Sequence, residues 1–541
     1  MTAQRDSPTR PLIAGTGIVA IGVLVAIVTV LGLNLLGFVL LAFAFGGIIA
    51  LLPGFLVRDP RAYWLFLLVL SIPFDIHKRV TSWAVDPFLL LRQYGPTASG
   101  TISLDIFLTD AVLLAMLLPW LAELCLKRER FYFPNVGYLF VFYLVLALIV
   151  SLAEAESLYL AICEFCRQVL YFLSFVYLIN NVVTRTQLRA IVFALFIGLG
   201  IVSGTVIAFF ALGIGTETNV FSGLYGDHEG KSTLAATYRY STMYTTLGKQ
   251  SSTVNESTTK RSAGIFTHPA ISASFVGLTA PLALAFLTVA RCYRDRILFG
   301  AFIASGFLAS FLTFSRAGLV GLVVGSMVSF VIGRWSGLVS RQAFRMCVFI
   351  FASVAVVSLP LLVTFLELRP GSITRRLEFI ELNLDSYWQR PILGTGLNNG
   401  SIAIQEGAQA LKDSPNSAAG LGAIPSHYLV VLIETGLVGF VLFFAFFGKI
   451  VIIAFRSMRA VETEMKVLLA GVVGGLSSLA IQNLADNAFG GHAINALLWL
   501  FAGMTVAIAR RAGLDRVRPT PGRVAPSLRL PLAAARGPGD P

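Results

Sequence analysis

Residues 428–455 read YLVVLIETGLVGFVLFFAFFGKIVIIAF, an apolar run in which only Glu434 and Lys449 are charged. A helix needs about 20 mostly apolar residues to cross the hydrocarbon core of a bilayer, so this run predicts a membrane-spanning helix. The rest of the chain is similar: of its 541 residues, 56% are hydrophobic and 13% are charged. Soluble domains carry about 25% charged residues, so the composition excludes an ordinary soluble enzyme. It predicts an all-α polytopic membrane protein.

The same length rule predicts about fourteen spans along the chain. The first pair, and the pair that meets at Ser315–Arg316, are the least clearly delimited, and without one of these pairs twelve spans remain. The predicted spans cover residues 12–31, 35–56, 62–76, 104–126, 133–153, 157–180, 188–213, 268–290, 296–314, 317–333, 344–366, 428–455, 466–484 and 488–509. The first span directly follows a short polar N-terminus, and we expect no cleavable signal peptide.

Clustered positive charge alternates between the connections and predicts the orientation, because Lys and Arg next to spans stay on the cytoplasmic side. The basic connections contain Arg58 and Arg61; Lys127, Arg128 and Arg130; Arg185 and Arg189; Arg291, Arg294 and Arg296; Arg334, Arg341 and Arg345; and Arg456, Arg459 and Lys466. We therefore expect both termini in the cytoplasm, and we interpret the net charge of +13 as a topology signal and not as a nucleic-acid surface. Residues 510–541 predict a disordered basic tail that either contacts anionic headgroups or serves only as a topological anchor.

This orientation places three long connections outside the cell, at about 77–103, 214–267 and 367–427. All five histidines, namely His77, His228, His268, His427 and His492, fall on that side as well. This sidedness suggests external chemistry, although histidine avoids the bilayer core in any case. The five cysteines show no metal or disulfide spacing, and the sequence contains no motif for a metal or another cofactor.

The 367–427 connection predicts an amphipathic helix on the outer membrane surface. Leu377, Ile380 and Leu384 recur at helical spacing, and Pro391 should end the helix. Arg375 and Arg376 stand at its N-terminal end, where backbone N–H groups already favour an anion, so they form a possible diphosphate cradle. The alternative interpretation is a solvated charged face.

Further cations occur near the same side of the membrane. Arg261 stands at the mouth of the 268–290 span, where it could hold a phosphate. Arg167 lies within a span, where Glu164 one turn away could neutralise it, and Arg316 lies in a tight hairpin, where it could snorkel instead. Together these arginines predict an outward-facing cavity of fixed positive charge, which complements a lipid-linked diphosphate.

His427 begins the 428–455 span and is a candidate general base, because a rigid helix would hold it beside a lipid-anchored substrate. The alternative role is a headgroup contact. Tyr428 follows directly. Glu434 lies seven residues on, along the same helix face, and a carboxylate within the membrane requires a partner or a water-filled cleft.

Four segments resemble, in this order, the O-antigen ligase and polysaccharide polymerase superfamily of bacterial inner membranes. They are RSAGIFTHP (261–269), LTFSRAGLVGL (312–322), RLEFIELNLDSYWQRPILGTGLNNG (376–400) and SHYLVVLIETGLVG (426–439). The resemblance covers about residues 160–505. It departs at two places. Pro425–Ser426 occupies the place nearest the His-Asn dipeptide usual in the family, which leaves His427 directly before Tyr428, and Pro269–Ala270 stands where the family often has Pro-Asn.

The resemblance implies a GT-C-like, metal-independent glycosyltransferase without a cofactor. Such an enzyme moves a glycan with inversion from undecaprenyl diphosphate to an acceptor glycan or lipid-linked hydroxyl. By motif, Arg261, Arg376 and Arg375 would hold the diphosphate, and Arg316 and Arg167 would support it. His427 would activate the acceptor, with Glu434 and Tyr428 in supporting positions.

The resemblance also divides the chain. We expect a cytoplasmic N-terminus over 1–11, N-terminal spans over 12–159, a ligase- or polymerase-like domain over 160–505 and the cytoplasmic tail over 510–541. The rival function is a lipid-linked oligosaccharide flippase or another transporter, but transporters usually consist of two related halves, and no such repeat is visible. The polymerase type is slightly favoured over the ligase type, because lipid A core is one specialised acceptor among many glycans.

Overall fold

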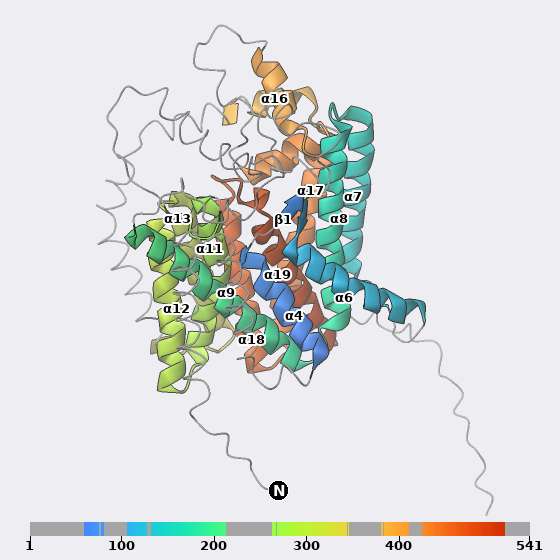
Figure 1. Cartoon of the computed structure of the whole chain (residues 1–541). Helices are drawn as coiled ribbons and strands as arrows, with labels where there is room; N and C mark the ends of the chain where they lie inside the picture. The colour runs from blue at the N-terminus through green and yellow to red at the C-terminus, as the bar shows by residue number, and fades with distance from the viewer. Residues whose placement is uncertain are drawn as a thin grey trace, which may run out of the picture.

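The computed structural model describes residues 59–74, 77–79, 105–126, 131–212, 262–266, 268–342, 345, 380–381, 383–409, 424 and 426–513. Within these ranges the chain forms a helical bundle (Figure 1). Its elements are α4 (Pro60–Ser71), η1 (Ile72–Phe74), β1 (His77–Arg79), β2 (Asp105–Phe107), α6 (Leu108–Cys125), α7 (Asn135–Glu154), α8 (Leu158–Asn181), α9 (Arg185–Ala211), α11 (Pro269–Val289), α12 (Tyr293–Leu312), α13 (Arg316–Trp335), α16 (Gly400–Gln409), α17 (His427–Met458), α18 (Thr463–Gln482), η3 (Ala488–Gly490) and α19 (His492–Arg511).

Ten helices in the described part of the chain are long and apolar enough to cross a membrane. They confirm ten of the predicted spans, and α4 with η1 forms a shorter apolar helix where 62–76 was predicted. The predicted spans 12–31 and 35–56 lie outside the described residues, and so does 344–366 apart from Arg345. The protein is therefore an all-α, multi-pass membrane protein.

The helices begin where local sequence satisfies their first N–H groups. Thr184 caps α9 in a reciprocal capping box with Gln187. Ser315 caps α13 by accepting a hydrogen bond from the Gly318 N–H group at 3.2 Å. The hairpin predicted at Ser315–Arg316 is confirmed, because α12 ends at Leu312 and α13 starts at Arg316.

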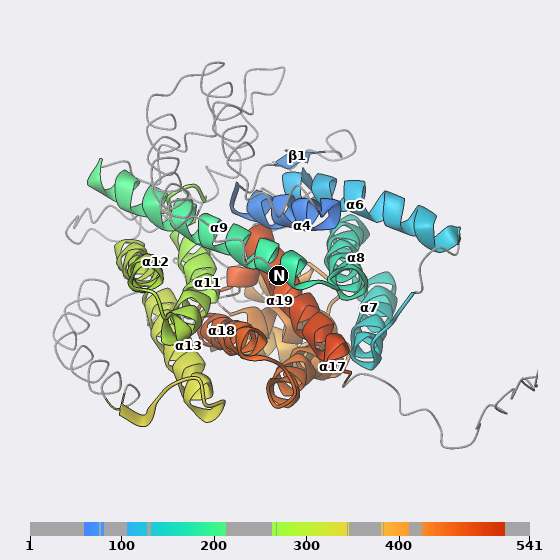
Figure 2. The ribbon, with the colours of Figure 1, turned by 90° about the horizontal axis from the view of Figure 1, so that it is seen from below.

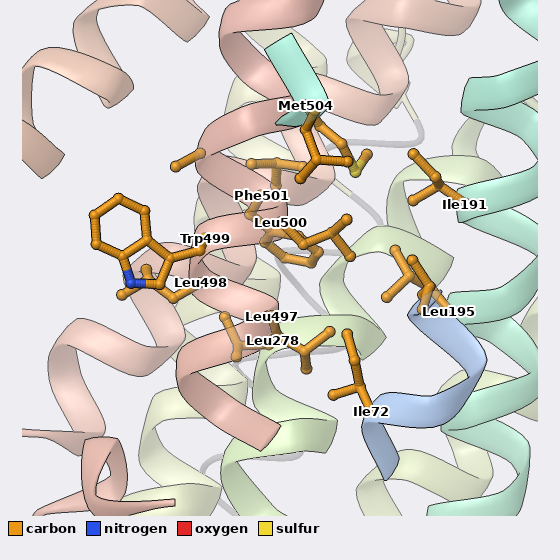
Figure 3. Close-up of a cluster of buried hydrophobic side chains, with 14 of the residues drawn as sticks. Ile72, Ile191, Leu195, Leu278, Leu497, Leu498, Trp499, Leu500, Phe501 and Met504 are labelled. Carbon is orange, nitrogen blue, oxygen red and sulfur yellow. The ribbon is translucent and has the colours of Figure 1, made fainter. Parts of the chain in front are cut away.

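The core lies around α19, which Figure 2 shows in the middle of the bundle with α8, α9, α17 and α18 around it. The Trp499 side chain is 1% exposed. The cluster in Figure 3 unites residues of η1, α9, α11 and α19, including Ile72, Ile191, Leu278 and Phe501. On the other side of α18, Gly474 faces Gly325 of α13. A Cβ at Gly474 would lie 2.6 Å from the Gly325 carbonyl oxygen, so only glycine permits this close helix approach.

The two ends of the bundle differ in charge. At one end, α9, α12 and α18 begin and α8, α13, α17 and α19 finish. We call it the basic end, because these helix ends carry Arg185, Arg189, Arg334, Arg456, Lys466, Arg510 and Arg511. Ion pairs link the helices at this end, including Arg189 with Glu464 at 2.8 Å and Arg61 with Glu123 at 3.2 Å. We call the opposite end, where α11, α13, α17 and α19 begin, the site end.

Candidate functional site

The short connection between α18 and α19 is the centre of the site end. Its first residue, Asn483, accepts a hydrogen bond from the Ser426 hydroxyl at its carbonyl oxygen (2.9 Å) and one from the Ala488 N–H at its side-chain oxygen (3.1 Å). Ser315, the cap of α13, lies 3.5 Å from Asp486 of the same connection. Just before it, the Gln482 amide donates to the Ala270 carbonyl of α11 at 3.1 Å. The first turns of α11, α13 and α17 therefore meet at the connection from which α19 starts.

His427, the predicted base, lies at this centre. It is half-buried, and its Nδ1 atom is 3.2 Å from Oδ1 of Asn487 in the α18–α19 connection. Its ring packs near Phe443, with the two centroids 5.9 Å apart. The imidazole is thus held from two sides at the first residue of α17.

The helix that carries His427 is not the straight span predicted for 428–455. Gly436 has φ +64° and ψ −173°, a conformation that breaks α17 into two halves and that essentially only glycine adopts. The Tyr428 and Phe444 rings stack with centroids 4.9 Å apart, whereas residues sixteen apart in an unbroken helix would be separated by about 24 Å. The first half of α17 therefore folds back beside the second half, which brings His427 next to Phe443.

A neighbouring segment, residues 390–400, holds this break, and we call it the strap. Thr395 and Gly396 donate their N–H groups to the carbonyls of Ile433 and Glu434, at 3.0 and 2.9 Å. Beyond the break, the Leu437 N–H donates to the Pro391 carbonyl at 2.9 Å, and the Val438 N–H to Ile392 at 3.4 Å. The strap thus replaces the helical hydrogen bonds that the break removes.

The strap is also fixed to the turn between α7 and α8. The Asn399 side chain accepts a hydrogen bond from the Ser157 N–H at 2.8 Å and donates one to its carbonyl at 3.3 Å. Arg390 pairs with Glu154 at 2.9 Å. The strap therefore joins α17 to α7 and α8. Two of the four segments that resemble the superfamily, 376–400 and 426–439, thus contact each other in the fold.

Glu434 lies in the first half of α17, directly before the break. It is 3% exposed, and its carboxylate accepts hydrogen bonds from the backbone N–H groups of Asn398 and Gly400 at the start of α16. Its Oε1 atom has no hydrogen-bond partner among the described residues. Glu164 of α8 interacts with it electrostatically and accepts a hydrogen bond from Gln168 at 2.7 Å. In this arrangement Glu434 ties the strap to α17.

Arg167 is buried, with 5% of its surface exposed. It forms an ion pair with Asp110 of α6 at 3.0 Å and lies over the Phe107 ring, 4.5 Å from the centroid. Glu164 was the partner considered from sequence, whereas the structure provides Asp110. Nη1 of Arg167 is 3.5 Å from Nδ1 of His492, which also lies 2.8 Å from the Tyr171 hydroxyl.

A small cavity of about 20 Å³ adjoins this cluster, and its polar lining includes Asp110, Tyr171 and His492. Its volume is sufficient for one water molecule. The cluster closes one side of the site end, since His492 is the first residue of α19.

Arg316 is the first residue of α13 and is half-buried. It directly follows Ser315, whose hydroxyl lies 3.5 Å from Asp486. Tyr428 donates to the Ala480 carbonyl of α18 at 2.9 Å, which fixes the first half of α17. The structure thus brings three predicted site residues, His427, Arg316 and Arg167, to the α18–α19 connection and the start of α19. Arg261, Arg375 and Arg376 lie outside the described residues.

The sequence did not indicate Asp110, Asn487 and His492 as members of this site. Their signal is weak: Asn487 and His492 are polar residues in a charge-poor turn, and Asp110 is one carboxylate in an apolar run. The described part of the chain holds no group of three or more His, Cys, Asp or Glu side chains arranged for a metal ion.

The amphipathic helix of the 367–427 connection is confirmed in its described part. Residues 383–389 are helical, and the helix ends before Pro391 as predicted. Its packing differs from the expectation: Asn383 and Ser386 are buried, whereas Leu384 and Trp388 are 37% and 68% exposed. An outward apolar stripe is typical of a helix that lies in a membrane interface.

Both signs of charge occur at the site end: its helix N-termini favour an anion, whereas Asp110, Glu434 and Asp486 add carboxylates there. The N-terminus of a helix carries about half a positive charge, and α11, α13, α17 and α19 all begin there, beside Arg316. Three hydrogen bonds hold these helix starts together. They join α11 to the last residue of α18, and the caps of α17 and α13 to the α18–α19 connection. This arrangement can bind a phosphate-like group and place a histidine beside it.

Residues 297–444 match the family model described as O-antigen ligase. The matched region contains Arg316, the strap, His427 and Glu434, and it ends before the α18–α19 connection. The comparison with curated proteins gave no match.

Proposed function

We propose that the chain is a membrane enzyme of the O-antigen ligase or polymerase type, and specifically a metal-independent, inverting glycosyltransferase. The match of residues 297–444 to the family model described as O-antigen ligase supports this proposal. The enzyme moves a glycan from undecaprenyl diphosphate to a hydroxyl of an acceptor glycan or a lipid-linked acceptor. The observation that carries the proposal is the gathering of helix N-termini, Arg316 and His427 around the α18–α19 connection.

In this proposal the site end stabilises the leaving group. A diphosphate leaves with developing negative charge, and fixed cations and helix dipoles in a poorly hydrated site stabilise such charge by several kcal/mol. Arg261, Arg375 and Arg376 hold the diphosphate, with Arg316 beside the α13 N-terminus and Arg167 as support. The ion pair with Asp110 keeps Arg167 in a fixed orientation.

His427 takes the proton of the acceptor hydroxyl as that oxygen attacks the anomeric carbon and the bond to the diphosphate breaks. A positioned general base contributes about 100- to 10,000-fold in rate. Glu434 and Tyr428 support His427, because they fix the first half of α17 to the strap and to α18.

We further propose that the enzyme lies in a bacterial inner membrane, with the site end facing outward and both termini in the cytoplasm. The basic end supports this orientation, because Lys and Arg next to spans are retained on the cytoplasmic side. A site on the outer face has no access to cytoplasmic nucleotides, and a lipid-diphosphate donor requires none.

The broken helix α17 supports an enzyme over a transporter. In transporters with broken helices, the backbone groups at the break bind the substrate or ion. Here the groups on both sides of Gly436 are hydrogen-bonded to the strap. The break therefore has a structural role in shaping the site end.

The test is glycan transfer by the purified protein in lipid, with a lipid-diphosphate glycan as donor and a glycan acceptor. We expect His427→Ala to lower the rate at least about 100-fold and Arg316→Ala to lower it strongly. Arg189→Ala, an exposed arginine at the basic end, is the matched control and should retain the wild-type rate.

Transfer at the wild-type rate by both site variants would refute the site assignment. Movement of the donor across the bilayer without any transfer would refute the enzyme. Analysis of the products separates the two subtypes: growth of lipid-linked chains indicates the polymerase type that we favour, and attachment to lipid A core indicates a ligase.

A further inference from the structure

Asn487 contacts His427 from a different part of the chain, sixty residues on. The Nδ1 atom of His427 and the Oδ1 atom of Asn487 are 3.2 Å apart. An amide oxygen only accepts hydrogen bonds, so a neutral histidine in this contact must carry its proton on Nδ1. Its lone pair then lies on Nε2, and this is the tautomer that can take a proton through Nε2.

The opposite arrangement would disable the histidine. If the amide nitrogen faced Nδ1, the imidazole would accept that hydrogen bond and carry its own proton on Nε2. Nε2 could then no longer remove a proton from an acceptor hydroxyl. The amide at position 487 therefore decides whether His427 can work as a base.

Asn483 anchors both sides of this contact. The Asn483 carbonyl binds the hydroxyl of Ser426, the residue before His427, and its side chain binds the N–H of Ala488, the residue after Asn487. The Asn483 amide nitrogen donates in turn to the Leu479 carbonyl at 3.0 Å. Both partners of the contact are thus fixed to the end of α18, while Phe443 packs near the imidazole ring.

We propose that Asn487 is the positioning residue of His427, holding the imidazole in the Nδ1–H tautomer with Nε2 as the basic atom. The catalytic part of this inference rests on the proposed function, whereas the tautomer does not. Asn487 acts through His427 and exchanges no proton with the substrate.

The tautomer is read directly by ¹⁵N NMR of protein labelled at histidine, with His427→Gln used to assign the signal. We expect the wild-type protein to show a protonated Nδ1 and an unprotonated Nε2. Asn487→Leu removes the acceptor and should abolish this preference. Asn487→Asp keeps an oxygen acceptor and should preserve it, which also separates loss of the contact from loss of the fold.

Transfer kinetics give the second readout. We expect Asn487→Leu to lower kcat at least about tenfold with KM within about twofold of wild type, and Asn487→Asp to restore most of the lost kcat. Asn135→Asp is the matched control, because Asn135 is exposed at the start of α7 at the basic end. It should behave as wild type.

The outcomes separate the two proposals. A wild-type His427 protonated on Nε2 overturns the inference, and so does a wild-type kcat in Asn487→Leu. A wild-type protein that performs no transfer, yet shows the Nδ1–H tautomer and loses it in Asn487→Leu, refutes the proposed function and leaves the positioning role of Asn487 standing.

Discussion

Replacing Gly436 by alanine should destabilise the protein, whereas the same replacement at Gly448 in the same helix should not. Gly436 has φ +64° and ψ −173°, and a Cβ added there would overlap the Ile392 carbonyl of the strap. The variant must therefore either adopt a strained backbone or push the strap away.

Both routes have a cost that can be worked out. A side chain forced into this backbone region costs about 1–3 kcal/mol. Moving the strap instead breaks the bonds from Leu437 to Pro391 and from Val438 to Ile392, each of which contributes about 0.5–1.5 kcal/mol. We expect Gly436→Ala to lower the free energy of unfolding by about 1–3 kcal/mol if one route is taken, and by up to about 6 kcal/mol if the backbone is strained and the strap also moves.

Gly448→Ala provides the matched control. Gly448 lies in the second half of α17, and no described atom lies within 4 Å of a Cβ built there. Alanine in an open helix interior should be neutral or stabilise by up to about 1 kcal/mol. The two variants therefore differ in strap contact and backbone conformation, while the chemical change is the same.

The measurement is unfolding of the purified proteins in mixed micelles, followed by far-UV circular dichroism during a denaturant titration. A change of less than about 0.5 kcal/mol in Gly436→Ala, with Gly448→Ala behaving as expected, would show that the strap does not hold the break in this conformation. Glycan transfer by folded Gly436→Ala should also fall, because His427 depends on the fold-back of α17.

The remaining predictions concern the buried ion pair, a helix cap and metal dependence. Asp110→Leu removes the carboxylate that pairs with the buried Arg167 and should lower the free energy of unfolding by about 3–5 kcal/mol. The double variant Asp110→Leu/Arg167→Leu should recover most of this loss. If the effects of the two single changes simply add, this expectation is wrong. Ser315→Ala removes the cap of α13 and should cost about 0.5–2 kcal/mol in the same assay, an expectation that an unchanged unfolding curve would exclude. Excess EDTA should leave the transfer rate within about twofold of the untreated enzyme, and loss of activity restored by one divalent cation would argue against metal-independent transfer.

Much of the fold could be predicted from local sequence. Span positions depend only on the length of apolar runs, and most predicted limits lie within a few residues of the observed helices; the span predicted for 317–333, for example, is α13, Arg316–Trp335. The hairpin before Arg316 and the helix end before Pro391 follow from short-range rules as well. The break at Gly436 was missed, because an apolar run with one glycine does not reveal a strap that supplies the missing hydrogen bonds.

The site was only partly predictable for the same reason. An arginine buried in a span, such as Arg167, requires a partner. The local sequence indicated Glu164, which lies at helical spacing, whereas the fold places Asp110, 57 residues away in the chain, beside Arg167. His427 and Arg316 were predicted as site residues from their own segments. The contact of Asn487 with His427 forms only where the α18–α19 connection meets the start of α17, which no local pattern encodes.

The order of the strap and α17 along the chain has a consequence for biogenesis. The strap binds Ser151 and Ser157, which are synthesised long before it, and then binds α17, which is synthesised after it. Because the chain is synthesised from its N-terminus, the turn between α7 and α8 enters the membrane first, the strap follows, and the broken helix α17 comes last. The strap is therefore already present when the two halves of α17 fold back on each other. The backbone N–H and carbonyl groups around Gly436 can then form their hydrogen bonds to the strap as α17 enters the bilayer.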